Sequence, residues 1–198
     1  TNGLTSMISR YLSELLLVAE KQLPHILQDT TAFLNIIKSK NKVDENTLLV
    51  TLDVTSLYTN IPQEEGANWV TEFYSETLSQ WSNYSPGLLP GKPETVKEMI
   101  LFVLKNSTFE FDNEFYVQNY GTTMGSSFSV RFANIYMHQF LKNFFQKNPS
   151  LKPEYVARLI DDIFFTWDKN KTELDTLINE LNSCHQTIKF EPTISETE

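Results

Sequence analysis

Three aspartates stand next to apolar segments that are typical of buried strands. Asp53 ends the run LLVTLD at residues 48–53, and the adjacent Asp161 and Asp162 interrupt the apolar stretch at residues 155–167. Adjacent carboxylates at the tip of an apolar hairpin repel each other unless a cation offsets their charge. Mg²⁺ prefers such hard oxygen ligands, and two ions close together activate an attacking hydroxyl and stabilise a leaving pyrophosphate. The pattern therefore favours a two-metal phosphoryl-transfer site.

Each signal also has an ordinary structural explanation when it is taken alone. An isolated Asp161-Asp162 pair indicates a solvated acidic turn, and Asp53 by itself indicates a helix cap or a turn. A third signal is the segment GTTMGSS at residues 121–127, which precedes a helical pattern. Two glycines before a helix let the backbone approach a phosphate, although such turns are also common connectors. The three signals in one chain, and not any one of them, indicate a site.

Apolar periodicity, together with Pro and Gly, predicts the elements that position these residues. Helices are predicted at residues 4–23, 31–39 (capped by Asp29 or Thr30), 64–78, 94–106, 126–147 and 173–182, strands at 48–53 and 188–191, hairpins at 109–117 and 155–167, and a loop at 82–92. This mixture of helices and hairpins indicates an α+β fold and not a doubly wound parallel sheet.

Composition and charge set limits on the class of protein. The 198 residues are enough for one domain, and we find no linker or repeat that would divide them. The single cysteine, Cys184, and the lack of a signal-like or membrane-length segment predict a soluble intracellular protein. The net charge of -9, with only three arginines, argues against a complete nucleic-acid-binding enzyme but not against the catalytic centre of one.

Three ordered motifs resemble the central motifs of reverse transcriptases. They are VTLDVTSLYTNIP at residues 50–62, YGTTMGSSFSVRFANIYM at residues 120–137 and RLIDDIF at residues 158–164. The tail SLYTNIP, the hairpin FEFDNEFY and the helix ANIYM are similar to the Penelope-like retroelement type. The resemblance implies a right-hand polymerase palm, an antiparallel sheet packed on helices, at about residues 48–198, with a helical part of the fingers at about residues 1–47.

The resemblance also implies roles for individual residues. Asp53, Asp161 and Asp162 would hold two Mg²⁺ ions, or Mn²⁺ instead, with the backbone carbonyl of Val54 as a further candidate ligand. The side chain of Tyr58 would exclude the 2′-hydroxyl of ribonucleotides. The residues expected to line the nascent base pair and template, or to fix the backbone there, are Gly121, Met124, Gly125 and Asn134.

By the same resemblance, the chain would copy an RNA template from a DNA primer with dNTPs, in the nucleus. It looks truncated at both ends, with basic fingers upstream, a thumb downstream and a GIY-YIG endonuclease elsewhere in a parent polyprotein. The isolated 198 residues are therefore expected to polymerise poorly or not at all. The sequence departs from the family at Ser127, Val130 and Leu159, and Arg131 lies where apolar residues are usual.

Three alternatives stay open at this point. The chain could be another palm polymerase, such as an RNA-dependent RNA polymerase. It could be a palm remnant without catalysis that binds RNA or serves in assembly. It could also be a globular protein with coincidental acidic turns, in which Asp53 and Asp161 would lie far apart.

Overall fold

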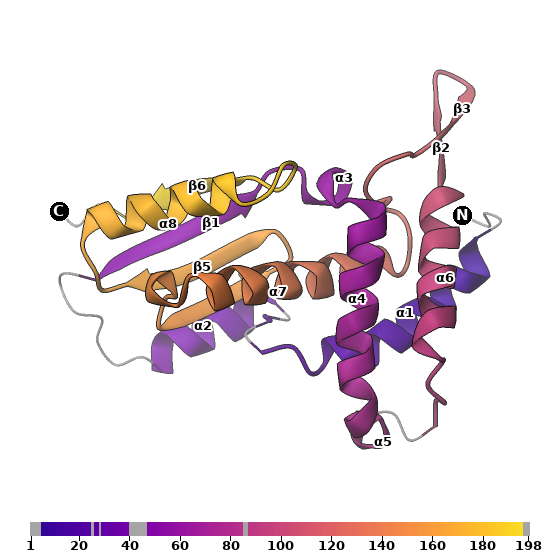
Figure 1. Cartoon of the computed structure of the whole chain (residues 1–198), viewed down its shortest axis with the longest axis horizontal. Coiled ribbons are helices and arrows are strands. Elements are labelled where there is room, and N and C mark those ends of the chain that lie inside the picture. The colour runs from indigo at the N-terminus through magenta and orange to yellow at the C-terminus, as the bar shows by residue number, and fades with distance from the viewer. Residues whose placement is uncertain (1–4, 25, 28, 40–46, 85–86, 196–198) are drawn as a thin grey trace. The chain divides into compact units, whose positions relative to one another are not determined.

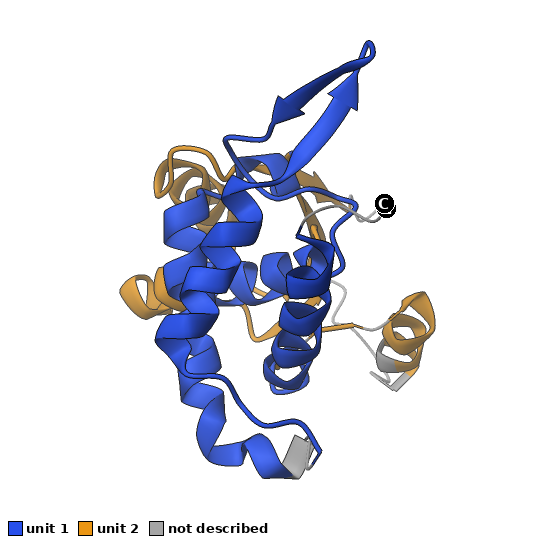
Figure 2. Ribbon diagram, turned by 90° about the vertical axis from the view of Figure 1, so that its right-hand side faces the viewer, with its two compact units in different colours: residues 1–23, 56–141 blue, residues 24–55, 142–198 orange. Residues whose placement is uncertain are grey.

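The computed structural model describes residues 5–24, 26–27, 29–39, 47–84 and 87–195. The chain divides into two compact units, each built from two separate stretches of sequence (Figure 2). Unit 1 contains residues 1–23 and 56–141, and unit 2 contains residues 24–55 and 142–198. The assignment of about residues 1–47 to fingers and the rest to palm stays a prediction.

Unit 2 is built on a four-stranded antiparallel sheet. Its strands are β1 (Leu48–Val54), β4 (Tyr155–Leu159), β5 (Asp162–Trp167) and β6 (Phe190–Ile194), in the order β4-β5-β1-β6 (Figure 1). The strand predicted at 48–53 and the hairpin predicted around Asp161-Asp162 are confirmed. The α+β class and the antiparallel sheet are therefore confirmed as well.

Buried apolar residues alternate with exposed residues along β1, and this alternation decides which face of the sheet is buried. Val50, Leu52 and Val54 are each at most 1% exposed, whereas Thr51 and Asp53 are exposed on the opposite face. Burying a side chain of this size stabilises the fold by about 1.5–3 kcal/mol. A slip of one residue would move this apolar set to the open face, so burial fixes the register of β1.

Helices complete unit 2. α8 (Lys171–Ser183) buries Leu174, Leu177 and Leu181, which share one face at helical spacing. Asn170 caps α8 by accepting from the Glu173 amide at 2.8 Å. Asn182 of α8 bonds both the amide and the carbonyl of Phe190, so the helix is tied to β6. The predicted cap of α2 (Thr30–Ser39) is also present, because Asp29 accepts from the Ala32 amide at 2.7 Å.

Unit 1 is mainly helical. Its elements are α1 (Ser6–Glu20), α3 (Leu57–Asn60), α4 (Gln63–Thr77), η1 (Leu78–Gln80), α5 (Trp81–Tyr84), α6 (Pro93–Lys105), the hairpin β2 (Thr108–Phe111) and β3 (Glu114–Val117), and most of α7 (Ser129–Lys147). The last residues of α7 and the short helix η2 (Pro149–Leu151) belong to unit 2. Helices α4 and α6 run side by side (Figure 1). Both helices contribute fully buried residues to the core of unit 1: Ala67, Val70 and Tyr74 from α4, and Val96, Ile100 and Val103 from α6.

The β2–β3 hairpin turns as its sequence predicts. Asp112 and Asn113 have φ values of 52° and 60°, the left-handed conformation that a two-residue type I′ turn requires. Phe109 lies opposite Tyr116, and their rings stack with centroids 5.6 Å apart.

Several predicted boundaries were wrong. Residues 82–84 of the predicted loop 82–92 belong to helix α5, which begins at Trp81, a residue whose ring packs against Tyr74. Residues 85–86 lie outside the described part. The long helix begins at Ser129 and not at residue 126, and the last strand spans Phe190–Ile194. Helix α3 was not predicted, because four residues carry no measurable periodicity. Among the described helices, none is both long and apolar enough to cross a membrane.

Tyr74 gives the fold of unit 1 a pH dependence. Its side chain is fully buried and its hydroxyl donates to the Gly91 carbonyl at 2.9 Å. Burial raises the pKa of Tyr74 from 10.0 to about 12. Above pH 10.0 the unfolded chain therefore ionises while the folded chain stays neutral, so the contribution of this group is complete below pH 10.0 and is lost as the pH rises towards 12.

We expect Tyr74→Phe to cost about 1 kcal/mol at neutral pH, because it removes one hydrogen bond and keeps the packing. The variant should also lose less stability than the wild type between pH 10.0 and 12. Urea unfolding at several pH values measures both effects. Equal pH dependence of the two proteins would contradict the assignment to Tyr74.

Candidate active site

The antiparallel register brings predicted carboxylates together at one end of the sheet in unit 2. Asp53, near the end of β1, lies directly opposite Asp162, the first residue of β5. Asp161 precedes β5 in the turn, and its carbonyl accepts a hydrogen bond from the Val54 amide at 3.1 Å. The β4–β5 turn and the end of β1 are thus joined through their backbones. This arrangement excludes the alternative in which Asp53 and Asp161 lie far apart.

A fourth acid stands on the other side of Asp53. Glu191 of β6 is the cross-strand partner of Asp53, and it accepts a hydrogen bond from the Thr55 hydroxyl at 3.3 Å. We call Asp53, Asp161, Asp162 and Glu191 the acidic cluster. The sequence analysis missed Glu191 because the strand predicted at residues 188–191 had no assigned partner, so an acid on that strand was the only signal.

Repulsion within the acidic cluster affects the titration of Asp53. Partial desolvation, and next the negative charges of Asp161, Asp162 and Glu191, raise the pKa of the Asp53 carboxyl above its ordinary value. The contribution of Asp53 to stability is therefore complete below the ordinary pKa and is lost as the pH rises. At neutral pH the ionised cluster destabilises the fold, although water at the exposed Asp53 screens part of the repulsion.

The donor chemistry of the acidic cluster fits hard divalent cations, because all its ligands are carboxylate oxygens. In the part of the chain that the structure describes, no group of three Asp, Glu, His or Cys side chains is already arranged to hold a metal ion. The carboxylates are therefore neighbours through the register of the strands and not a formed coordination shell. A cation would have to draw their side chains together.

The turn that carries Asp161 has a strained backbone. Ile160 has a φ of 57°, a left-handed conformation that is disfavoured for a β-branched residue. Its carbonyl accepts a hydrogen bond at 2.8 Å from Arg158, whose side chain is only 4% exposed. Strain of this kind persists where the surroundings enforce it, and it is common at functional sites. The buried Arg158 and the Val54 amide hold the turn from its two sides.

In unit 1, the glycine segment (residues 121–127) packs backbone to backbone against α3. Gly121 has a φ of 67°, and a Cβ added to it would lie 2.2 Å from the Tyr58 carbonyl oxygen and 2.6 Å from the Thr59 Cα. The Thr122 amide donates to that same Tyr58 carbonyl at 2.7 Å. Only glycine fits this contact, so Gly121 fixes the backbone of Tyr58, whose side chain is half-buried.

Gln63 is a further anchor of the glycine segment, and the sequence analysis missed it. Its Nε2 lies 3.1 Å from the Gly121 carbonyl, 3.3 Å from that of Gln118 and 3.4 Å from that of Leu104. One side-chain amide therefore connects α4, the end of α6 and the glycine segment. No periodicity or motif identifies such a residue, because its partners lie more than 40 positions away.

The other predicted substrate residues divide into exposed and buried positions. Met124 is 76% exposed, and a Cβ on Gly125 would meet no atom within 4 Å, so a ligand can reach both. Asn134 is only 4% exposed, and its amide donates to Glu20 of α1 at 2.5 Å. Its position suits a structural role better than contact with a substrate.

We expect Gly121→Ala to destabilise unit 1 by about 2–4 kcal/mol, because the new methyl group meets backbone atoms and the φ is left-handed. Gly125→Ala is the matched control in the same segment, with an expected effect within about 1 kcal/mol. Urea unfolding measures both. Similar costs for the two variants would show that the contact with Tyr58 does not constrain the segment.

Telomerase structures from two Candida species have a similar fold. Apo telomerase from Candida tropicalis matches with a TM-score of 0.69 at 14% identity, over 96% of this chain and 36% of that one. Telomerase from Candida albicans, in complex with a TWJ fragment of telomeric RNA, matches with a TM-score of 0.58 at 13% identity, over 97% of this chain and 35% of that one. The chain spans little more than a third of these telomerases. The predicted palm with part of the fingers is confirmed as a fold.

Sequence comparison supports the same relationship independently of the fold. No curated protein matches the sequence. The family profile described as reverse transcriptase (RNA-dependent DNA polymerase) matches residues 2–192. This match covers nearly the whole chain and includes all three of the motifs. The chain therefore belongs to the reverse transcriptase (RNA-dependent DNA polymerase) family.

Proposed function

We propose that the chain is the catalytic core of an RNA-directed DNA polymerase, which adds deoxynucleotides from dNTPs to the 3′-hydroxyl of a primer. The acidic cluster is the observation that carries this proposal. The register β5-β1-β6 sets Asp162, Asp53 and Glu191 side by side, and desolvation and the repulsion between these carboxylates raise the pKa of Asp53. Such repulsion is expected where divalent cations complete a site.

In this proposal, Asp53, Asp161 and Asp162 hold two Mg²⁺ ions, which Mn²⁺ can replace, with the Val54 carbonyl as a further ligand. Bound there, the ions would activate the primer hydroxyl and stabilise the leaving pyrophosphate. Arg158 contributes by fixing the turn that presents Asp161. The whole cluster lies in unit 2.

Unit 1 supplies the proposed nucleotide contacts. The exposed Met124 and Gly125 line the nascent base pair, and Gly121 holds the segment that carries them. Tyr58 would exclude the 2′-hydroxyl, since Gly121 and Thr122 fix its backbone against the glycine segment.

The finer assignment is to the Penelope-like type, which the tail SLYTNIP and the helix ANIYM support. In this assignment, the chain copies an RNA template from a DNA primer in the nucleus. It is part of a longer polyprotein that also contains fingers, a thumb and a GIY-YIG endonuclease. One of the similar telomerase structures is a complex with an RNA fragment, which is in keeping with an RNA template.

A non-catalytic palm remnant that binds RNA or serves in assembly is the second candidate. Two observations favour it: the net charge of -9, and the lack, in the described residues, of any side-chain group already arranged to hold a metal ion. Metal binding separates the two candidates, because a remnant keeps the carboxylates but has no need to bind ions with them.

We expect Mg²⁺ to stabilise the wild-type chain by about 1.4 kcal/mol when its concentration is ten times the Kd, or roughly 3–6 °C in Tm. Asp53→Asn should melt at a higher temperature than the wild type in EDTA, because it removes repulsion from the acidic cluster. It should also gain little from Mg²⁺. Thermal unfolding with and without Mg²⁺ measures both effects.

Asp175→Asn is the matched control, since it removes an exposed carboxylate from α8 in the same unit. It should respond to Mg²⁺ as the wild type does. A wild type that gains nothing from Mg²⁺ or Mn²⁺ would favour the non-catalytic remnant.

Primer extension on a primed RNA with dNTPs tests the activity directly. We expect the 198-residue chain to extend primers weakly at best, and Asp161→Asn to lower any activity more than about 100-fold, since even groups that only support metal ligands contribute 10–100-fold. Activity retained by Asp161→Asn would contradict the proposed site.

An RNA-dependent RNA polymerase is distinguished at Tyr58. In a chain that extends primers, Tyr58→Ala should admit ribonucleotides if the enzyme is a DNA polymerase. Tyr58→Phe is the matched control, because it keeps the ring that would exclude the 2′-hydroxyl. Unchanged discrimination in Tyr58→Ala would count against the DNA-polymerase assignment.

A further inference from the structure

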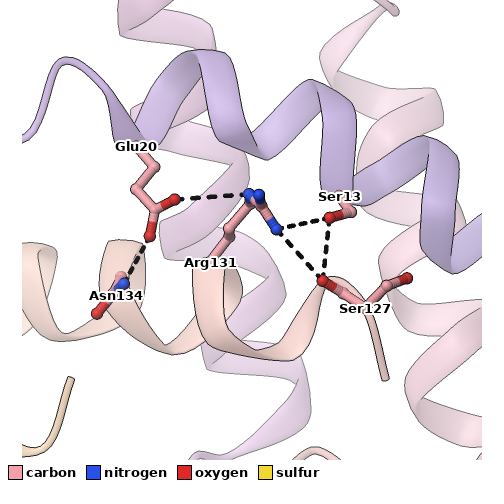
Figure 3. Close-up of polar contacts among 5 residues, drawn as sticks. All are labelled: Ser13, Glu20, Ser127, Arg131 and Asn134. Carbon is pink, nitrogen blue, oxygen red and sulfur yellow. Dashed lines mark hydrogen bonds and ion pairs between the residues drawn. The ribbon is translucent and has the colours of Figure 1, made fainter. Parts of the chain in front are cut away.

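A polar cluster joins α1 to the beginning of α7 within unit 1 (Figure 3). Its members are Ser13 and Glu20 of α1, Ser127 at the end of the glycine segment, and Arg131 and Asn134 of α7. We call these five residues the Glu20–Arg131 cluster. None of them belongs to the acidic cluster, and the sequence analysis noted Arg131 only as a charge where apolar residues are usual.

Arg131 stands at the centre of the Glu20–Arg131 cluster. Its Nε lies 3.5 Å from a carboxylate oxygen of Glu20, and its Nη1 donates to the Ser13 hydroxyl at 2.7 Å. The same Nη1 lies 3.4 Å from the Ser127 carbonyl, to which the Ser13 hydroxyl also donates at 3.0 Å. Two side chains therefore converge on the last carbonyl of the glycine segment, as Figure 3 shows.

Glu20 is the group that orients Arg131. One of its carboxylate oxygens faces Arg131, and the other accepts from the buried Asn134 amide at 2.5 Å. A carboxylate held at both oxygens has little freedom to turn, so its charge presents a fixed partner to the guanidinium. Asn134 is thus connected to the glycine segment through Glu20 and Arg131.

Burial distinguishes this ion pair from an ordinary surface pair. The side chains of Arg131 and Glu20 are 26% and 17% exposed, whereas those of Lys105 and Glu64, the other ion pair found among the described residues, are 55% and 61% exposed. Water weakens an exposed pair and allows its members to separate, so such pairs contribute little. A half-buried pair with further hydrogen bonds holds its geometry, and the loss of one member leaves the other charge poorly solvated.

We propose that Arg131 is a positioning residue for the glycine segment: paired with Glu20, it holds the Ser127 carbonyl on α1 and so sets the backbone that presents Met124 and Gly125. The role in nucleotide binding rests on the proposed function, whereas the role in ordering the segment does not. Gly121 fixes the start of the segment against Tyr58, and Arg131 fixes its end.

The alternative is that the pair merely adds stability to the packing of α1 and α7. The two roles predict different effects when the Glu20–Arg131 pair is removed. A positioning residue changes the glycine segment locally, whereas a contribution to packing lowers the protection of the whole unit. Hydrogen exchange at single amides distinguishes them.

The test uses the full chain and the amides of Ser126 and Ser129, which donate to the carbonyls of Thr123 and Ser126 at 3.3 and 3.2 Å. Gly66 and Val96 give reference amides, because they occupy the first turns of α4 and α6 in the same unit. We expect Arg131→Met to speed exchange at Ser126 and Ser129 about tenfold, with less than about a twofold change at the reference amides.

Three companion variants make the result specific. Arg131→Lys keeps the charge but lacks the planar fork, so it should recover only part of the protection. Glu20→Gln should have a smaller effect in the Arg131→Met background than in the wild type, because the two residues act as a unit. Lys105→Met removes the exposed pair and should leave the exchange of Ser126 and Ser129 unchanged.

Unchanged exchange in Arg131→Met, or a rise that is equal at the reference amides, would overturn the proposal. So would additive effects of Glu20→Gln and Arg131→Met. Where primer extension is measurable, Arg131→Met should raise the KM for dNTPs more than it lowers kcat, because the acidic cluster is intact. A local rise in exchange supports the positioning role whether or not the wild type extends primers, whereas a wild type that gains no stability from Mg²⁺ or Mn²⁺ would count against the proposed function alone.

Discussion

The register of β1 between β5 and β6 is the constraint on which the acidic cluster depends. Val50, Leu52 and Val54 can be buried only if β1 presents Thr51 and Asp53 on the other face. Once that register is set, Asp162 and Glu191 are the obligatory neighbours of Asp53. Hydrophobic burial therefore provides the free energy that holds like charges together. The repulsion is the smaller effect on the fold, and together with the larger contribution of desolvation it raises the pKa of Asp53.

A second constraint works on the backbone in unit 1. The absence of a side chain at Gly121 lets the glycine segment approach Tyr58 so closely that any Cβ would overlap its carbonyl. Gln63 then bonds the same segment from the side of α4. The neighbours of Gly121 are main-chain atoms of Tyr58 and Thr59, which cannot turn aside as a flexible side chain can. The segment is thus held at its start by packing, while Met124 and Gly125 stay open to a ligand.

A strained backbone and a buried charge both lie at the β4–β5 turn, next to Asp161 of the acidic cluster. Ile160 adopts a left-handed conformation beside Asp161, and the buried Arg158 bonds its carbonyl. Neither feature improves the core, since an asparagine or glycine would turn the hairpin at lower cost. Their presence next to the acidic cluster agrees with a turn whose shape matters more than its stability.

The amino-acid sequence by itself determined the elements with a strong local signal and the motif residues within them. Helical spacing predicted α1, α4, α6 and α8, and Asp112-Asn113 predicted the β2–β3 turn, because these depend on neighbours a few positions apart. Asp53, Asp161 and Asp162 were identified by the apolar runs around them. The start of α7 was predicted three residues too early, because Ser126 and Ser127 are compatible with either a helix or a turn.

Only the tertiary structure decided which distant residues meet. Glu191 joins Asp53 across 138 positions of sequence, and Arg131 meets Ser13 across 118 positions. Such contacts depend on strand pairing and helix packing, which the core determines, and no local pattern reports them. The sequence could therefore indicate the chemistry of the site, while the fold alone could bring its supporting residues together.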